Sequence, residues 1–247
     1  MDAPLFFAPP QNRDGDLIHL PAEEARHARV LRLRPGAPVV VIDGLGTAWR
    51  AELLAGKADR ATARIHSEVR QFGEPRVRLT LAAGLSTGSK FDAVVEKGTE
   101  LGVSRFVPLI TERSKVEIED ARRARLRANR LARVALAATK QCRRSVVPEV
   151  ALPTRFRDFL KQHDPAFPAL VFHPGRTGRP LTSVSLPDGA ARITLLIGPE
   201  SGFTEIEVEA AERIGFVPVS LGSRILRTET AGPVAVALVM SRLGELS

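Results

Sequence analysis

The sequence is poor in residues that mark several classes of protein. Its 247 residues include 1 Cys, 1 Trp, 2 Met and no Tyr. The single cysteine, Cys142, has no partner for an internal disulfide, and no Cys/His cluster has the spacing of a zinc site. No apolar run approaches the length of about 18 residues that a transmembrane helix needs. We therefore expect no structural disulfide, no metal site and no membrane span.

The N-terminal segment MDAPLFFAPP lacks a basic head and has a short apolar run, which does not fit a secretory signal. With 44% hydrophobic and 26% charged residues, the chain has enough apolar side chains for a real core. Its length fits one large domain or two small ones. We expect a soluble cytoplasmic protein.

The chain carries 36 basic and 28 acidic residues, a formal net charge of +8. Six of the basic residues are lysines and 30 are arginines. Arginine keeps its charge and donates paired hydrogen bonds to phosphate oxygens. A basic excess makes a polyanion the first candidate partner. Nucleic acid ranks ahead of a membrane, since no basic amphipathic helix has an aromatic face.

The pattern of apolar residues divides the chain near residues 71–75. Before this linker, short strands are predicted with one helix after Pro21 and a hairpin turn at Asp43-Gly44, which is typical of a small barrel. After it, strands and helices alternate, which predicts a mostly parallel α/β sheet. The predicted strands are 16–20, 39–43, 47–54, 61–69, 77–83, 106–110, 170–173, 193–198 and 217–221, and the predicted later helices are 91–101, 119–142, 204–214 and 230–243.

The helix predicted from Glu119 to Cys142 carries the strongest charge pattern. The segment from Arg122 to Arg144 contains eight Arg, one Lys and no acid. A narrow apolar stripe recurs at steps of three or four: Ala124, Ala128, Leu131, Ala135, Ala138 and Cys142. The opposite face is either a solvated surface or a site for an anion. Uncompensated like charges destabilise a helix, which favours the anion.

Two strand ends near the C-terminus are predicted to bind a ligand. LLIGPESGFT (195–204) and LGSRILRTET (221–230) each run from a strand through a glycine-bearing loop to a helix. Thr204 and Glu207 have the spacing of a capping box. Ligands of open α/β sheets lie beyond the carboxyl ends of strands, although each loop could also be a plain connection. Pro233 fits the last helix if it lies in the first turn.

The sequence does not contain the motifs of other common enzyme classes. The segment Gly84–Lys90 lacks the glycine–lysine–serine order of a phosphate-binding loop, and Phe91 occupies the magnesium-ligand position. Neither a dinucleotide-binding glycine motif nor a serine-nucleophile elbow is present. His27 and His173 could be ligands, but isolated histidines are more often structural. A nucleoside triphosphate or a dinucleotide is therefore disfavoured.

The two loops, extended to LLIGPESGFTEIE and LGSRILRTETA, resemble the cofactor loops of SPOUT-type methyltransferases. More narrowly, they are similar to the ribosomal RNA small subunit methyltransferase E family. EKGTELGVSRFVPLITERS (96–114) and AATKQCRRSVVPEV (137–150) resemble the middle motifs of that family, and HARVLRLRPG (27–36) resembles its N-terminal motif. The resemblance covers most of the chain in the order of the family.

The resemblance implies a PUA-like RNA-binding β-barrel at residues 1–72, followed by an α/β SPOUT domain at 73–247 with a C-terminal trefoil knot. It also implies S-adenosylmethionine as the cofactor, a homodimer, and methylation of N3 of one uridine in 16S ribosomal RNA on the assembled small subunit. The family pattern differs from this chain at Lys140, Ser201 and Ser223 and at Gly232-Pro233. Ser201 preserves its loop unless a positive φ is needed there.

The residues then have expected roles. A cofactor wall is expected to continue from His173 through Pro174 and Gly175, and the expected cofactor-binding residues are Phe172, His173, Ile197, Gly198, Pro199, Glu200, Gly202, Leu221, Gly222, Ile225, Leu226 and Thr228. Arg227 is expected to stabilise charge on a uridine oxygen, and Glu200 or Glu229 to accept the N3 proton. The expected RNA-binding residues are Arg29, Arg32, Arg34, Arg122, Arg123, Arg130, Arg143 and Arg144.

Two alternatives remain open. A non-catalytic RNA-binding or ribosome-assembly factor would explain the basic surface, but not the two glycine-bearing loops. A SPOUT enzyme that acts on transfer RNA would explain both. S-adenosylmethionine binding separates the first alternative from an enzyme, and mapping of the methylated RNA separates the second.

Overall fold

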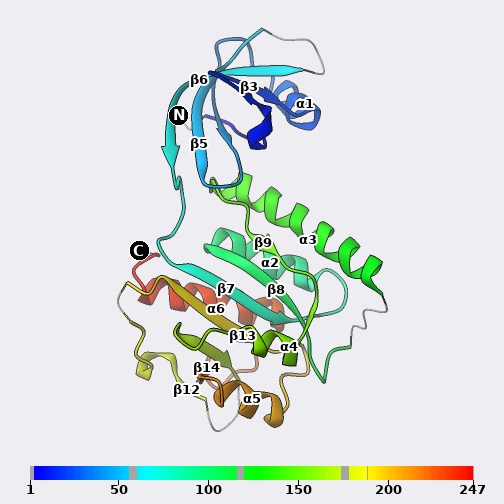
Figure 1. Ribbon diagram of the computed structural model, residues 1–247, viewed down its shortest axis with the longest axis vertical. Coiled ribbons are helices and arrows are strands. Elements are labelled where there is room, and N and C mark those ends of the chain that lie inside the picture. Colours follow the sequence, from blue (N-terminus) through cyan, green and yellow to red (C-terminus); the bar gives the residue numbers. More distant parts are fainter. Residues whose placement is uncertain (1–2, 56–59, 116–119, 174–177, 188, 247) are drawn as a thin grey trace. The chain divides into compact units, whose positions relative to one another are not determined.

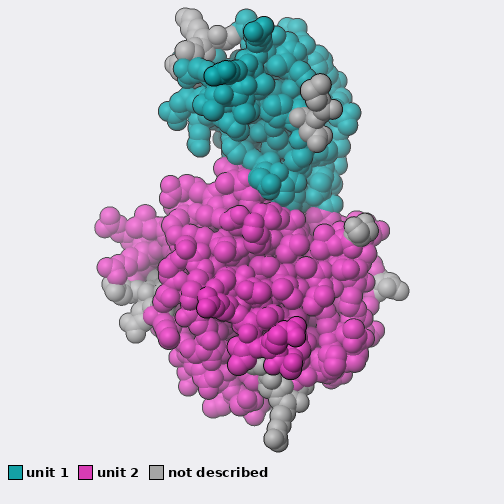
Figure 2. Space-filling view, turned by 180° about the vertical axis from the view of Figure 1, so that it is seen from behind, with its two compact units in different colours: residues 1–74, 139–147 teal, residues 75–138, 148–247 magenta. Residues whose placement is uncertain are grey.

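The computed structural model describes residues 3–55, 60–115, 120–173, 178–187 and 189–246. The chain divides into two compact units, shown in teal and magenta in Figure 2. Unit 1 contains residues 1–74 and 139–147, and unit 2 contains residues 75–138 and 148–247. The break at 74/75 lies close to the predicted boundary at 72/73. The return of residues 139–147 to unit 1 was not predicted.

Unit 1 is a curled six-stranded sheet with one helix (Figure 1). The strand order is β1-β4-β5-β6-β3-β2, and all pairs except β1–β4 are antiparallel. Phe6, Ile18 and Trp49 are buried in its core. The elements are β1 (Leu5–Phe7), η1 (Pro10–Asn12), β2 (Arg13–Asp14), β3 (Leu17–Leu20), α1 (Ala22–Val30), β4 (Pro38–Ile42), β5 (Thr47–Leu53) and β6 (Ala61–Arg70). The short strands and single helix confirm the predicted character of this region.

Unit 2 is a parallel sheet of eight strands in the order β10-β8-β7-β13-β11-β14-β12, with β9 paired to β8. Every pair within it is parallel, which agrees with the prediction of a mostly parallel sheet. The strands are β7 (Arg78–Gly84), β8 (Val103–Ile110), β9 (Glu149–Val150), β10 (Thr154–Arg155), β11 (Ala169–Phe172), β12 (Arg179–Pro180), β13 (Arg192–Ile197) and β14 (Phe216–Ser220). The predicted C-terminal trefoil knot stays a prediction.

Helices cover both faces of this sheet (Figure 1). On one face, α2 packs against α6 and β8, and α6 contacts β7 and β13. On the other, Phe156 and Phe159 of α4 share a buried cluster with Val208 and Ala211 of α5. The helices are α2 (Lys90–Glu100), α3 (Ala121–Cys142), α4 (Phe156–Lys161), α5 (Glu205–Glu212) and α6 (Thr228–Arg242), with a short η2 (Leu181–Ser183). Burial on both faces explains why the central strands read as continuous apolar runs.

The long helix α3 buries its predicted stripe. Leu131 and Ala135 are fully buried, and Ala124, Ala128 and Ala138 are nearly so, whereas Cys142 at the end of the stripe is half-buried. Glu119, where the helix was predicted to begin, lies outside the described residues. The helix ends in unit 1, where Lys140 donates a hydrogen bond of 2.6 Å to the buried carboxylate of Glu24. Lys140, a departure from the family pattern, therefore neutralises a buried acid of unit 1.

The expectation for Pro233 was wrong. Helix α6 begins at Thr228, so Pro233 is its sixth residue and lies beyond the first turn. Proline has no N–H for the carbonyl four residues earlier, that of Glu229. The helix nevertheless continues to Arg242, packed against β7, β13 and α2. Tertiary packing therefore outweighs the tendency of proline to interrupt a helix here.

Candidate functional site

The carboxyl ends of three neighbouring strands form a cavity in unit 2. In the sheet register, Phe172 at the end of β11 pairs with Ile197 of β13 on one side and with Val219 of β14 on the other. The described residues that follow these strands therefore lie at one edge of the sheet. They enclose about 300 Å³, and the lining residues are Arg113, Phe172, His173, Ile197, Gly198, Pro199, Glu200, Ser201, Gly202, Phe203, Leu221, Gly222, Arg224, Ile225, Leu226, Thr228 and Ala231.

The loop after β13 turns so tightly that it needs glycine. A Cβ on Gly198 would lie 2.9 Å from the backbone nitrogen of Phe203. Gly202 has a φ of +69° and donates its N–H to the carbonyl of Pro199. Ser201 does not have a positive φ, so serine is accommodated at this departure from the family pattern. The loop leads directly into α5.

A capping box fixes the start of α5, as predicted. The Thr204 hydroxyl accepts from the backbone N–H of Glu207, and the Glu207 carboxylate accepts from the N–H of Thr204. The other Glu207 oxygen accepts from the backbone N–H of Glu112 at 2.9 Å. One buried carboxylate therefore ties the loop after β13 to the loop after β8.

Two cations bind the same loop. The Arg113 guanidinium donates to the carbonyl oxygens of Ser201 and Phe203, at 3.1 and 3.4 Å. Lys90, the first residue of α2, donates to the carboxylate of Glu200. That hydrogen bond is the main reason why the pKa of Glu200 is lowered, and the charges of Lys90, Lys115 and Arg227 lower it further. Glu200 therefore carries its negative charge at neutral pH.

The loop after β14 forms the opposite wall. Gly222 has a φ of +98°, and its N–H donates to the Ser220 hydroxyl at 3.1 Å. The Thr228 hydroxyl, in the first turn of α6, donates to the carbonyl oxygen of Gly198 at 3.5 Å and so bridges the two walls. Ile225 lines the cavity with 89% of its surface exposed. An isoleucine this exposed offers apolar area for a ligand to cover.

The structure brings all twelve residues predicted to bind the cofactor around this single cavity. The role of each in binding is taken up as a proposal below. Pro174 and Gly175, expected to continue the wall from His173, lie outside the described residues. Five lining residues were not predicted: Arg113, Ser201, Phe203, Arg224 and Ala231. Arg113 follows the end of a predicted strand, and this position is the feature of the sequence that could have identified it as a lining residue.

The three residues predicted to be catalytic occupy different places. Glu200 lines the cavity, whereas Arg227 and Glu229 flank the lining residue Thr228. The Arg227 side chain is 83% exposed, and its Nη1 lies 4.0 Å from Oε1 of Glu229. The Glu229 side chain is 23% exposed, and its Oε2 is buried with no hydrogen-bond partner among the described residues. Arg227 and Glu229 thus lie beside the cavity.

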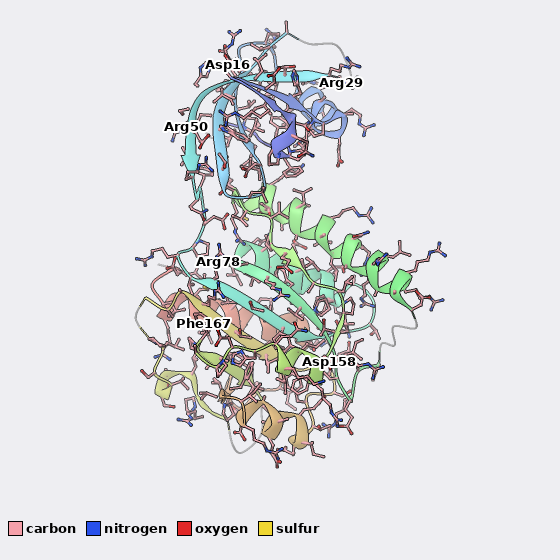
Figure 3. All side chains as sticks on the ribbon, in the orientation of Figure 1. Asp16, Arg29, Arg50, Arg78, Asp158 and Phe167 are labelled. Atoms are coloured by element: carbon pink, nitrogen blue, oxygen red, sulfur yellow. The ribbon has the colours of Figure 1, made fainter. Side chains whose placement is uncertain are left out.

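Most of the arginines predicted to bind RNA are accessible to solvent. Arg32 and Arg34 are exposed in unit 1, as is Arg29 on α1 (Figure 3), and Arg122 and Arg123 are exposed on α3. Arg143 is half-buried. Arg130 is half-buried and donates to Asp92 at 2.6 Å.

Arg144 departs from the RNA prediction. It is 3% exposed, and its guanidinium donates to Glu74 Oε2 at 2.8 and 3.1 Å. The other Glu74 oxygen accepts from the backbone N–H groups of Ser145 and Val146. The Arg144 charge is therefore neutralised inside unit 1, so the expectation that it contacts RNA was wrong.

The described residues include no group of three or more His, Cys, Asp or Glu side chains arranged to hold a metal ion. In the part of the chain that the structure describes, no helix is long and apolar enough to cross a membrane. The cavity is lined mainly by backbone and apolar side chains, with one carboxylate, that of Glu200, and with Arg113 bonded to the loop itself; the remaining polar lining residues are His173, Ser201, Arg224 and Thr228. Such a lining suits a flat, partly apolar ligand that carries no phosphate.

Comparisons with known proteins agree with this organisation. The RNA methyltransferase PUA domain family matches residues 20–65, and the RNA methyltransferase domain family matches residues 73–240. A ribosomal RNA small subunit methyltransferase E from Synechocystis sp. is 35% identical over 97% of this chain and 77% of its own length.

Two solved structures are similar across nearly the whole chain. The Neisseria gonorrhoeae ribosomal RNA small subunit methyltransferase E, bound to S-adenosyl methionine, is 34% identical with a TM-score of 0.88, covering 97% of this chain and 98% of its own. A Legionella pneumophila protein in complex with the same cofactor is 29% identical with a TM-score of 0.86, covering 98% of both chains. These similarities confirm the predicted fold class, a PUA-like domain followed by an α/β methyltransferase domain.

Proposed function

Because the chain belongs to the ribosomal RNA small subunit methyltransferase E family, we propose that it methylates N3 of one uridine in 16S ribosomal RNA. The chain is an S-adenosylmethionine-dependent methyltransferase of small-subunit ribosomal RNA. The finer part of the proposal is the uridine, its ring nitrogen and the assembled small subunit as the substrate. Family membership supports this finer part, and the convergence of the twelve predicted residues on one cavity supports the methyl transfer itself.

The residues around this cavity fit S-adenosylmethionine. The cofactor supplies a methyl group on a positively charged sulfonium and carries an adenine and an amino acid, but no phosphate. Ile225 and Leu226 offer apolar surface for a flat ring, and the loop from Gly198 to Gly202 offers backbone groups at close range. The ionised Glu200 supplies negative charge beside a cationic ligand. We assign all twelve residues to cofactor binding.

The reaction requires that the uridine N3 lose its proton. N3 is nucleophilic only as the imidate, and each unit by which its pKa exceeds the ambient pH costs about 1.4 kcal/mol. The proton passes to a carboxylate, the N3–methyl bond forms and the sulfur–methyl bond breaks, leaving S-adenosylhomocysteine. The protein must therefore supply a proton acceptor and a cation for the carbonyl oxygens.

Glu229 is the better of the two candidate proton acceptors. The pKa of Glu200 is lowered by its hydrogen bond from Lys90, and a lowered pKa makes a weaker base. Glu229 follows the lining residue Thr228 and has one carboxylate oxygen without a hydrogen-bond partner among the described residues, so no described donor competes for that oxygen. The exposed guanidinium of Arg227, beside Glu229, stabilises the negative charge that develops on the uridine oxygen.

The remaining parts of the proposal concern RNA binding and assembly. Residues 1–72 and the exposed arginines of α3 bind structured RNA through its phosphates, and residues 73–247 contain the catalytic site. Neutralising six to ten phosphates implies a loss of about 10³–10⁵ in affinity between 50 and 200 mM salt. The enzyme acts as a homodimer in the cytoplasm, where small subunits assemble.

A methylation assay with mapped products tests this function. The purified protein is incubated with labelled S-adenosylmethionine and, separately, with unmodified assembled small subunits, free 16S ribosomal RNA and transfer RNA. We expect one N3-methyluridine, located by nuclease digestion and mass spectrometry, with the highest yield on assembled subunits. A label in transfer RNA would replace the proposed substrate, and RNA binding without calorimetric binding of S-adenosylmethionine would indicate an assembly factor.

A further inference from the structure

The end of helix α1 leaves two neighbouring apolar side chains in water. Val30, the last residue of α1, is 78% exposed, and Leu31, which follows it, is 45% exposed. Other apolar residues of the same segment serve the core of unit 1, because Ala28 is buried there and Leu33 packs against it. Single exposed apolar residues are ordinary, but an adjacent pair forms a small apolar surface that folding does not use.

Exposed arginines lie on both sides of this apolar pair in the chain. None of their side chains makes a hydrogen bond or an ion pair with another described residue. The sequence contains no acid between Glu24 and Asp43. We define the α1 tip as the apolar pair together with these arginines, and its members are Arg26, Arg29 (Figure 3), Val30, Leu31, Arg32 and Arg34.

The acids of unit 1 do not neutralise the α1 tip. Most of them are paired with other cations, and the ion pairs include Arg13–Glu68, Arg64–Glu52, Lys140–Glu24 and Arg144–Glu74. Among the described residues of unit 1, Asp14 and Glu23 are exposed acids without such a partner. Four arginines against two acids leave a positive surplus at the α1 tip, which attracts an anion.

Arg32 has a backbone conformation that favours glycine. Its φ is +54°. Its N–H donates to the carbonyl of Arg29 at 2.8 Å, and the N–H of Leu33 donates to the carbonyl of Ala28 at 3.1 Å. This pair of hydrogen bonds is the Schellman motif, which ends helices with a left-handed residue that is usually glycine. An arginine at a position where stability favours glycine is typical of a functional residue.

The combination of apolar and cationic side chains fits one kind of RNA surface. Arginines bind phosphates on any RNA, but phosphates offer no contact to Val30 or Leu31. An A-form duplex presents phosphates and ribose hydroxyls and keeps the faces of its bases stacked inside. An unpaired and unstacked base, by contrast, exposes a flat apolar face close to the phosphates of its own strand.

We propose that the α1 tip binds an unpaired nucleotide of the RNA, with Val30 and Leu31 against the face of its base and the arginines on neighbouring phosphates. This inference deepens the proposed function and rests on it for RNA as the partner. It gives unit 1 a preference for a loop or a bulge. Phosphate contacts alone would make unit 1 insensitive to base pairing.

The variant Val30→Ser tests the apolar contact. Val30→Ile is its conservative counterpart, because it keeps an apolar and β-branched side chain at the same place. Ile206→Ser is the matched control, since Ile206 is 67% exposed on α5 beside the exposed acids Glu205 and Glu209, where RNA is repelled. Affinity for an unmodified 16S ribosomal RNA transcript is measured over a series of KCl concentrations, and the melting temperature of each variant is recorded.

We expect Val30→Ser to weaken RNA binding by about 3- to 10-fold at every salt concentration. The slope of log K against log salt stays that of the parent, because an apolar contact releases no counterions. Val30→Ile and Ile206→Ser keep the parent affinity within about twofold, and the melting temperatures of all three variants stay near that of the parent. Equal RNA affinity of Val30→Ser and Ile206→Ser would overturn the proposal.

A pair of synthetic RNAs tests the unpaired base. One is a perfect duplex, and the other is the same duplex with a central internal loop of mismatched bases, so that both carry the same number of phosphates. We expect the parent to bind the looped RNA more tightly and Val30→Ser to lose this preference. An equal loss of affinity on both RNAs would show that Val30 does not contact an unstacked base.

Arg32→Gly provides a second and independent test. Glycine relieves the strained conformation, so the melting temperature should stay unchanged or rise. RNA binding should nevertheless weaken, with a slope of log K against log salt lower by about 0.7–0.9, the value for one phosphate contact. Gln71→Gly is the control, because the exposed Gln71 has a similar φ of +52° and no charge. Parent-like RNA binding by Arg32→Gly would contradict the phosphate contacts of the α1 tip.

The α1 tip and the proposed function fail in different ways. If the parent protein methylates 16S ribosomal RNA while Val30→Ser and Ile206→Ser bind it alike, the tip is wrong and the function stands. If the parent protein binds no S-adenosylmethionine, the function is wrong, and the RNA-binding comparison still decides the tip because it requires no turnover. A loss for Val30→Ser on assembled subunits but not on free RNA would indicate a protein partner and overturn the nucleotide contact.

Discussion

Gly84 and Pro199 lie so close together that no side chain fits between them. A Cβ on Gly84, the last residue of β7, would lie 2.3 Å from the backbone nitrogen of Pro199. Pro199 belongs to the loop that lines the proposed cofactor cavity, and β7 is the direct neighbour of β13 in the sheet. The backbone at the end of β7 therefore packs directly against the loop that follows β13, its neighbour in the sheet.

Gly84→Ala should displace this loop. The added methyl group meets backbone atoms, which cannot move aside as a flexible side chain can, so a cost of about 1–3 kcal/mol is expected. Calorimetry should show at least about a tenfold loss of S-adenosylmethionine affinity. Gly232→Ala on α6 is the control, because its Cβ would meet Val94 at an ordinary 3.4 Å. Equal affinity of the two variants would show that the loop does not depend on this contact.

Ile225→Ala should weaken cofactor binding without weakening the fold. Ile225 is 89% exposed in the cavity lining, so its apolar surface is buried when a ligand covers it rather than when the chain folds. The expected loss is about 1–2 kcal/mol, or roughly a 5- to 30-fold rise in Kd. Ile206→Ala on α5, where the isoleucine is 67% exposed outside the cavity, should leave Kd unchanged. A fall in melting temperature for Ile225→Ala alone would contradict this interpretation.

Arg227→Ala should slow methyl transfer while leaving cofactor affinity intact. The side chain is 83% exposed and is not part of the cavity lining, and its charge is the smallest of the effects on the pKa of Glu200, so its removal should leave the fold intact and change cofactor affinity little. Loss of a charge that stabilises the uridine oxygen should lower kcat by about 10²-fold in single-turnover assays. Arg213→Ala, at the C-terminal cap of α5, is a control of similar exposure. Near-normal turnover of a folded Arg227→Ala protein would remove Arg227 from the mechanism.

Much of the site was predictable because its residues follow strands. Apolar runs identified β13 and β14, and glycines directly after Ile197 and Leu221 identified tight loops. Parallel strands place their carboxyl ends at one edge, so loops distant in sequence had to meet there. The capping residues Thr204 and Glu207 are three positions apart, a spacing that sequence alone reveals.

Other features depend on partners that no local pattern identifies. Arg113 binds the carbonyl of Ser201, which lies 88 positions later in the chain. Glu74 pairs with Arg144, 70 positions away, and this contact helps place residues 139–147 in unit 1. The basic residues between Arg122 and Arg144 look alike in sequence, but Arg144 is buried and paired, whereas Arg122 and Arg123 are exposed. Pro233 similarly reads as a helix breaker until the packing of α6 is known.

His163 should make the stability of the protein depend on pH. Burial lowers its pKa below the ordinary value of 6.5, and its ring packs 4.5 Å from that of Phe216. The unfolded chain therefore binds a proton that the folded chain binds less readily. The free energy of unfolding should fall as the pH drops through 6.5 and level off below the folded-state pKa. Urea titrations of His163→Phe should show a smaller fall over this range than the parent.

Arg144→Ala should destabilise unit 1 and should not change how RNA binding depends on salt. Removing Arg144 leaves the buried Glu74 carboxylate without its partner cation, which costs about 3–5 kcal/mol of unfolding free energy in urea titrations. The exposed Arg133→Ala on α3 should change stability by less than about 0.5 kcal/mol, but lower the salt slope of RNA binding by about 0.7–0.9. Glu74→Ala, which keeps the arginine, should destabilise the protein to a similar degree. Had Arg144 been an RNA contact, Arg144→Ala would lower the salt slope and leave the unfolding free energy near that of Arg133→Ala.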